Sequence, residues 1–129
     1  KEHDSRWVHR PYTDWKRIER RNQPGTPEER IFSGLQCLIA ARKNHPVFNG
    51  NDFQWVDTGS SHVFAYLRTH AGERALVLAN FSEVPQPISG NLLRLYGLSY
   101  QFTDLITNRS LPSADFTLAA YETLCLKAT

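Results

Sequence analysis

The segment from Asp4 to Pro11 contains the residue types best suited to chemistry. It holds Arg6 and Arg10 together with a tryptophan, a histidine and an aspartate, without helical or strand periodicity. Guanidinium groups bind carboxylates through two parallel hydrogen bonds and also stack on aromatic rings. Such a loop suits the binding of polar, anionic or sugar groups, but it equally suits a salt bridge to another domain. Composition alone leaves both interpretations open.

No other pattern in the chain predicts a catalytic centre. A glycosidase needs a pair of carboxylates, but each aspartate considered for such a pair occurs in a turn or at a strand end, where aspartate forms local hydrogen bonds. These aspartates are Asp14, Asp52, Asp57, Asp104 and Asp115. The histidines lack the spacing of metal ligands; they are His3, His9, His45, His62 and His70. Phosphate-binding and nucleophile motifs are also absent. We therefore expect no catalytic residue, metal or cofactor in this chain.

Composition and charge narrow the class of protein. The 129 residues are enough for one domain, with 40% hydrophobic and 22% charged residues, which is ordinary for a soluble globular protein. No apolar run approaches the roughly 18 residues of a membrane span, so we expect no membrane partner. The net charge is +3 over residues 1–21 and −1 over residues 22–129. Within this basic arm, Lys16, Arg17, Arg20 and Arg21 lie beside Trp15, but the chain otherwise lacks nucleic-acid motifs, so we expect no nucleic-acid partner.

The two cysteines favour a reducing compartment. Cys37 lies in an apolar helical pattern and Cys125 in a strand pattern. We predict two buried thiols, since nothing in their spacing requires a disulfide. A cytoplasmic, bacterial location is the corresponding expectation.

Two helices are predicted before residue 47. A short one between Thr13 and Arg21 has Thr13 as its cap. A longer one over residues 26–44 begins with a capping box, in which Thr26 is the N-cap and Pro27 the first helical residue. Its apolar residues recur at helical spacing and predict a packed stripe. They are Ile31, Leu35, Leu38 and Ile39.

The rest of the chain changes to strand patterning with frequent turn signals. This favours an antiparallel sheet or a small sandwich, so the fold class is mainly β with an N-terminal helical segment. Proline at 85 and 87 suits an edge strand or a bulge. The predicted strands are residues 53–56, 62–68, 75–79, 100–106, 116–118 and 121–126.

Three motifs resemble the amylosucrase and sucrose hydrolase branch of the α-amylase superfamily. Asp4–Pro11 resembles the loop after the eighth barrel strand of these enzymes. Residues 30–46, with Arg30-Ile31-Phe32 and His45-Pro46, resemble the last barrel helix, and Val77–Glu83 resembles a strand of domain C. The resemblance spans essentially the whole chain in order. The first motif is specific to the sucrose-acting branch, whereas the other two occur more widely in the superfamily.

The resemblance implies a C-terminal piece of a larger enzyme. Residues 1–46 would be a remnant of the (β/α)8 catalytic barrel, with an active-site loop at 1–11 and a helix at about 27–44, and residues 47–129 would be domain C. The whole enzyme would transfer glucose from sucrose, with retention, to an α-glucan or to water. Its catalytic carboxylates would precede residue 1. Arg6 matches the substrate-pocket arginine, whose planar fork pairs with a carboxylate better than lysine does.

Two alternatives remain open at this stage. A stand-alone carbohydrate-binding module would use surface aromatic residues such as Trp55, Tyr96 or Tyr100, although strand context favours packing roles for them. A structural domain would use the helix at 27–44 to form a homo-oligomer. The expected partners are the catalytic barrel, sucrose and α-glucan. The sequence does not distinguish polymerase from hydrolase.

Overall fold

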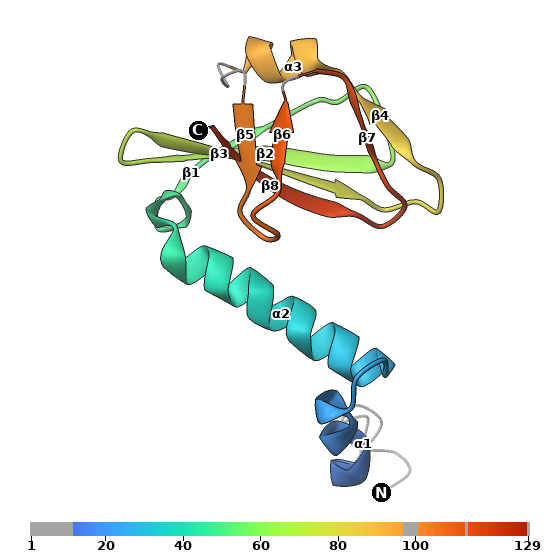
Figure 1. Cartoon of the computed structure of the whole chain (residues 1–129). Coiled ribbons are helices and arrows are strands. Elements are labelled where there is room, and N and C mark those ends of the chain that lie inside the picture. Colours follow the sequence, from blue (N-terminus) through green and yellow to red (C-terminus); the bar gives the residue numbers. More distant parts are fainter. Residues whose placement is uncertain (1–11, 97–100, 113, 129) are drawn as a thin grey trace, which may run out of the picture. The chain divides into compact units, whose positions relative to one another are not determined.

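The computed structural model describes residues 12–96, 101–112 and 114–128. They belong to two compact units, of which the first ends at Cys37 and the second begins at Leu38. The boundary falls inside helix α2 (Pro27–Asn44). The second unit is a mostly antiparallel β-structure (Figure 1). The predicted fold class, mainly β after a helical segment, is therefore confirmed.

The first unit contains helix α1 (Trp15–Glu19) and the 3₁₀ turn η2 (Arg20–Asn22). Asp14, rather than the predicted Thr13, caps α1, because its carboxylate accepts a hydrogen bond from the Arg17 amide at 3.1 Å. Glu28 pairs with Arg17 at 3.1 Å and with Arg20 at 3.5 Å. A hydrogen bond from its own backbone amide, and then Arg17, lower the pKa of Glu28.

The predicted start of the long helix is confirmed. The Thr26 hydroxyl accepts a hydrogen bond from the Glu29 amide at 3.2 Å, and α2 begins at Pro27. Only half of the capping box forms, since the Thr26 amide donates to the Gln23 carbonyl at 3.3 Å. The cap therefore satisfies one of the free amides of the first turn.

The predicted packing of α2 is wrong. Its apolar stripe is exposed, with exposed fractions of 64% for Ile31, 52% for Leu35, 47% for Leu38 and 54% for Ile39. The buried residue of α2 is instead Ala41, which packs with Leu105 and Cys125 in a small cluster near the C-terminal end of the helix. Helical periodicity specifies an apolar face, but it does not specify what covers that face.

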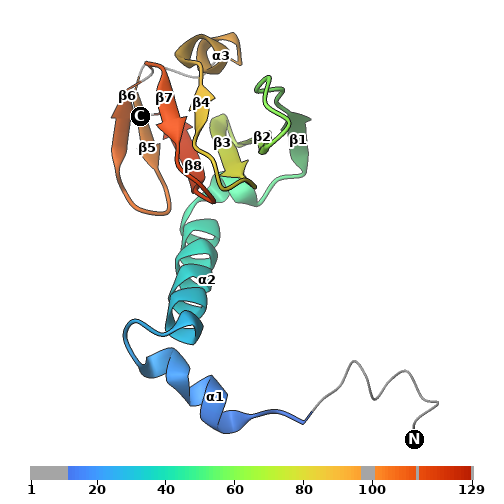
Figure 2. The ribbon, with the colours of Figure 1, turned by 90° about the vertical axis from the view of Figure 1, so that its right-hand side faces the viewer.

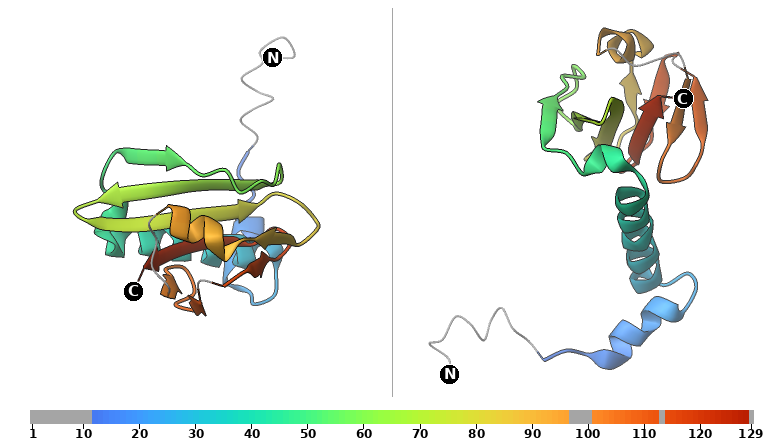
Figure 3. Two further views of the ribbon diagram at one scale, coloured as in Figure 1. Left: turned by 90° about the horizontal axis from the view of Figure 1, so that it is seen from above. Right: turned by 90° about the vertical axis from the view of Figure 1, so that its left-hand side faces the viewer.

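Within the described residues, six strands form one antiparallel sheet in the spatial order β1-β2-β3-β8-β5-β6. Their bounds are β1 (Asp52–Trp55), β2 (Val63–His70), β3 (Glu73–Asn80), β8 (Thr123–Ala128), β5 (Gln101–Asp104) and β6 (Ser110–Pro112). The short 3₁₀ turn η3 (Pro46–Phe48) leads into β1. Figure 3 shows β1 beside β2 at one edge of the sheet. Strand β6 was not predicted.

A two-stranded sheet pairs β4 (Gln86–Ile88) with β7 (Phe116–Leu118). Pro87 lies in β4, in agreement with the prediction of an edge strand, since each strand of a two-stranded sheet has a free side. Helix α3 (Gly90–Leu95) follows β4 and was also not predicted. Its six residues are too short for a clear helical period.

The main core lies between the large sheet and the layer formed by β4, β7 and α3 (Figure 2). We call this side of the large sheet the inner face. Alternate residues of β2, β3 and β8 point into it, as the period of two in a strand requires. The core residues are Val56, Ala65, Leu67, Leu76, Leu78, Ile88, Leu93, Phe102, Leu118, Leu124 and Leu126.

Two buried polar residues hold the turns of the β-unit. The carboxylate of Asp104, fully buried, accepts hydrogen bonds from the Cys125 amide at 2.9 Å and from the amide and hydroxyl of Thr107 at 3.1 and 2.5 Å. The Asn80 amide group donates to the carbonyls of Val84 and Ala119, both at 2.9 Å. Both side chains thus hydrogen-bond backbone groups of neighbouring turns, and Asp104 provides a partner for the buried Cys125 amide.

None of the described helices combines the length and the hydropathy needed to cross a bilayer.

Candidate functional site

The opposite side of the large sheet, here called the outer face, is unusually aromatic. Trp55 of β1 lies opposite Tyr66 of β2, and Tyr66 lies opposite Val77 of β3, so these side chains share one side of the sheet. Phe53 and Phe64 follow at spacings of two along β1 and β2. Phe81, just beyond β3, contacts Phe64. We call these five residues (Phe53, Trp55, Phe64, Tyr66 and Phe81) the aromatic face.

The rings of the aromatic face pack against one another and remain open to solvent. The exposed fractions are 44% for Phe53, 62% for Trp55, 41% for Phe64 and 73% for Phe81. Ring centroids are 4.7 Å apart in Phe53–Trp55 and 5.1 Å apart in Trp55–Phe64, with nearly perpendicular planes. Edge-to-face packing stabilises such pairs, but it leaves a contiguous apolar patch of the kind that marks an interaction site.

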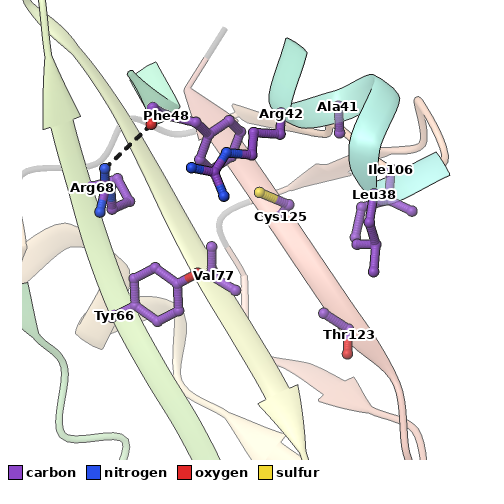
Figure 4. A pocket seen from close by; sticks show the side chains of 10 residues that line it. All are labelled: Leu38, Ala41, Arg42, Phe48, Tyr66, Arg68, Val77, Ile106, Thr123 and Cys125. Carbon is purple, nitrogen blue, oxygen red and sulfur yellow. Dashed lines mark hydrogen bonds between the residues drawn. The ribbon is translucent and has the colours of Figure 1, made fainter. Parts of the chain in front are cut away.

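A pocket of about 220 Å³ adjoins the aromatic face and shares Tyr66 with it (Figure 4). The last turns of α2, η3, the outer face of β2, β3 and β8, and the segment after β5 all contribute to it. Its apolar lining residues are Leu38, Ala41, Phe48, Val77 and Ile106, and its other lining residues are Arg42, Tyr66, Arg68, Thr123 and Cys125. Its polar groups are thus cations, hydroxyls and a thiol.

Burial raises the pKa values of two groups that line the pocket, a thiol and a phenol hydroxyl. It raises the pKa of the Cys125 thiol to about 12, and the nearby Asp104 charge adds to this effect. Burial also raises the pKa of the Tyr66 hydroxyl, against the opposing influence of Arg68 and Arg42. Both groups therefore stay protonated at neutral pH, and the charge of the pocket is that of its arginines.

The structure assigns local roles to most of the candidate carboxylates. Asp14 caps α1, Asp57 accepts from the Gly59 amide at 2.8 Å, and Asp115 accepts from the Gly90 amide at 2.8 Å. Asp104 holds the turn after β5. These contacts support the structural interpretation of each residue.

The other predicted site residues have different outcomes. Arg6 and its loop, like Tyr100, lie outside the described residues, so the assignment of Arg6 stays a prediction. Among the described histidines, cysteines and carboxylates no group of three could hold a metal ion. Tyr96 is partly buried, and its hydroxyl accepts from the Asp57 amide at 3.4 Å. Trp55 is exposed rather than packed into the core.

One of the two thiol predictions is wrong. Both cysteines are free, but Cys37 is exposed whereas Cys125 is buried. Cys37 lies on α2, whose apolar stripe is also exposed, so a helical pattern alone did not determine its burial. Cys125 is buried because it faces the small cluster with Ala41 and Leu105.

The pocket and the aromatic face were missed by sequence reasoning for different reasons. The pocket joins residues from several separate segments, and no local pattern connects Arg42 to Thr123. The aromatic face did leave a signal, because Phe64 and Tyr66 alternate with Val63, Ala65 and Leu67. Such a strand is apolar on both sides, and only the tertiary structure shows which side is covered.

Residues 53–124, more than half of the chain, match the family described as the maltogenic amylase C-terminal domain. The chain belongs to this family. It is therefore an α-amylase-type C-terminal domain, and its antiparallel β-unit is the fold that such domains have.

The curated relatives are much longer proteins. An oligo-1,6-glucosidase of Bacillus cereus is 29% identical over 106 residues, which cover 78% of this chain and 18% of that protein. The 1,4-α-glucan branching enzyme GlgB of Cellvibrio japonicus (strain Ueda107) is 25% identical over 112 residues, covering 76% of this chain and 14% of that protein. The chain thus spans less than a fifth of these relatives.

Solved structures share the fold. A MutB mutant in complex with glucose superimposes with a TM-score of 0.60 and 23% identity, over 82% of this chain and 19% of that chain. AmyP in complex with maltose gives a TM-score of 0.58 and 14% identity, over 70% of this chain and 18% of that chain.

Proposed function

We propose that this chain is the non-catalytic C-terminal part of a sucrose-acting glucosyltransferase, and that the β-unit supports a preceding (β/α)8 catalytic region. Family membership supports the coarser part of this proposal, a C-terminal domain of a glucan-active enzyme. The relatives are an oligo-1,6-glucosidase and a branching enzyme. Each is several times longer than the segment it shares with this chain.

The aromatic face is the single observation that carries the proposal. A free-standing soluble domain rarely exposes a contiguous patch of large apolar side chains, yet Trp55 and Phe81 are 62% and 73% exposed. The apolar stripe of α2 is exposed as well, including Leu35 at 52%. Both surfaces are accounted for if a catalytic region covers each of them in a longer polypeptide.

The choice of sucrose rests on the N-terminal loop. Asp4–Pro11 resembles the loop after the eighth barrel strand in amylosucrases, and this resemblance implies that Arg6 is the pocket arginine. Barrel active sites lie on the loops that follow the strands. A MutB mutant with a similar fold has been crystallised in complex with the substrate sucrose. This is compatible with the choice of sucrose.

A comparison of this chain with a polypeptide that also contains the preceding region tests the proposal. We expect the longer polypeptide to release fructose from sucrose and to transfer or release glucose. The 129-residue chain should release no glucose above a heat-killed control, because we expect its catalytic acid and nucleophile to lie in the preceding region. A longer polypeptide that cleaves isomaltose or branches α-glucan, but leaves sucrose intact, would contradict the sucrose assignment.

A stand-alone carbohydrate-binding module is the second candidate, favoured by the exposure of Trp55. Sugars stack on open ring faces, whereas the rings next to Trp55 pack edge to face at 87° and 84°. Polar groups that could orient a sugar are also few on this patch. Retention of the chain on a maltoheptaose column, lost in Trp55→Ala, would support this alternative instead.

A further inference from the structure

The pocket on the outer face holds two arginines that form no ion pair with any described carboxylate. The Arg42 side chain has no hydrogen bond or ion pair within the described residues, whose ion pairs lie elsewhere. Arg68 is held by the backbone carbonyls of Phe48, at 3.3 Å, and Gly50. Figure 4 shows both guanidinium groups beside the apolar wall of the pocket. Two cations thus share one small site.

The rest of the lining defines what would fit this site. Leu38, Phe48 and Val77 supply apolar walls, and Tyr66 and Thr123 supply hydroxyl groups. None of the lining residues is acidic. Asp104 lies near Cys125, but among the described ion pairs none joins it to Arg42 or Arg68. Its oxygens accept hydrogen bonds from backbone amides and from Thr107 instead. The complementary group is a carboxylate on a compact apolar stem.

The volume limits the size of this group. Pockets for whole small molecules usually measure about 300–1,000 Å³, whereas this one measures about 220 Å³. One acidic side chain with an apolar neighbour fits such a space. Tyr66 belongs to both the pocket and the aromatic face. Any surface that covers the aromatic face therefore reaches the rim of the pocket too.

We propose that the pocket receives an aspartate or glutamate side chain from the catalytic region, which forms an ion pair with Arg42 and Arg68. This inference rests on the proposed function. An apolar surface laid over two guanidinium groups that lack a counter-ion would remove their water without compensating their charge, which is strongly unfavourable. A carboxylate at this point compensates the charges and fixes the register of the interface.

The chemistry of the pocket is testable on the 129-residue chain with benzoate as the probe. We expect benzoate to shift the amide resonances of Val77, Thr123 and Cys125 in a saturable way. Benzyl alcohol, which has the same ring without the charge, should bind at least about tenfold more weakly, because each ionic hydrogen bond contributes more than a neutral one. Equal binding of the two probes would overturn the proposal.

Matched variants of α2 identify the cation. Arg42→Gln should weaken benzoate binding about tenfold, the scale of one ionic hydrogen bond. Lys43→Gln removes an equal charge from the neighbouring exposed residue and should leave benzoate binding unchanged. Amide spectra that stay dispersed show that both variants fold. An equal loss in the two variants would mean general attraction to a basic helix end, and it would overturn the pocket assignment.

The longer polypeptide tests the source of the carboxylate. If a side chain of the catalytic region fills the pocket, benzoate should no longer shift the pocket resonances there. Undiminished benzoate binding would overturn this assignment and identify a site for a free carboxylate. Sucrose cleavage measured on the same sample separates the proposed function from the proposed ion pair. A longer polypeptide that excludes benzoate but does not cleave sucrose would contradict only the proposed substrate.

Discussion

Cys37 and Cys125 are both free thiols, but Cys37 is exposed to solvent and Cys125 is buried. Since only the thiolate is nucleophilic, exposure and pKa together decide reactivity. At pH 8 we expect the Cys37 thiol to react with Ellman's reagent at least about a hundredfold faster than the Cys125 thiol. Cys37→Ser should abolish the fast phase. Two thiols of equal rate in the folded chain would contradict the burial of Cys125.

The raised pKa of Cys125 also predicts how stability depends on pH. The ordinary thiol pKa is 9.0, and the folded value is about 12. Between these values the unfolded thiol loses its proton while the folded thiol keeps it. The free energy of unfolding should therefore fall as pH rises from 9 towards 12, by up to about 1.4 kcal/mol per pH unit. Urea titrations of wild type and Cys125→Ala measure this, and the variant should lack that part of the slope.

Arg6 is proposed to pair with a carboxylate of the substrate pocket in the longer enzyme. Arg6→Ala would leave that carboxylate without its partner, and kcat/KM for sucrose should fall at least about a hundredfold. Arg6→Lys should also be poor, because an ammonium group cannot form the planar fork. Arg10→Ala, the matched control, should have a smaller effect. If Arg10 is the more sensitive position, Arg6 is the wrong assignment.

Helix α2 was correctly predicted as a helix, but its apolar stripe is exposed rather than packed. Because Leu35 is 52% exposed, Leu35→Ala should change the free energy of unfolding of this chain by less than about 0.5 kcal/mol. Leu124→Ala, in the core at 1% exposure, should cost about 2–5 kcal/mol. Chemical denaturation of both variants checks the contrast. A large loss for Leu35→Ala would mean that the stripe is covered, for example by a second copy of the chain.

The aromatic face is the surface of the β-unit that we propose to contact the catalytic region. In this chain Trp55→Ser with Phe64→Ser removes four edge-to-face ring pairs, each of which contributes about 0.5–1.5 kcal/mol, so the free energy of unfolding should fall by about 2–6 kcal/mol. The same double variant should bind less of the dye ANS and aggregate less. In the longer polypeptide it should lower the midpoint of thermal unfolding by several degrees more than it does in this chain, since a buried interface is lost there as well.

Leu95→Ser is the control for this experiment. Leu95 is 83% exposed and lies on α3, which packs on the inner face through Leu93. The substitution removes exposed apolar surface without touching the aromatic face. It should leave the thermal midpoint of the longer polypeptide unchanged. Equal effects of the two variants would mean that the aromatic face is not a specific interface.

Helices and strands with local sequence signals could be predicted from the sequence alone. Thr26 and Pro27 mark the start of α2, because capping needs only residues within one turn. The alternating and apolar runs of β2, β3 and β8 specify strands, since a period of two is visible in a few residues. The family resemblance also came from contiguous motifs such as Val77–Glu83, and the C-terminal domain family confirms its coarser part.

Which apolar faces are covered could not be predicted from the sequence. The pattern of Ile31, Leu35, Leu38 and Ile39 predicts an apolar stripe, but burial requires a second surface that the pattern does not name. In the same way β2 is apolar on both sides, and its inner side is buried because β4, β7 and α3 pack there. Arg42 and Thr123 meet in one pocket because helix and strands fold together, and no local spacing records such a contact.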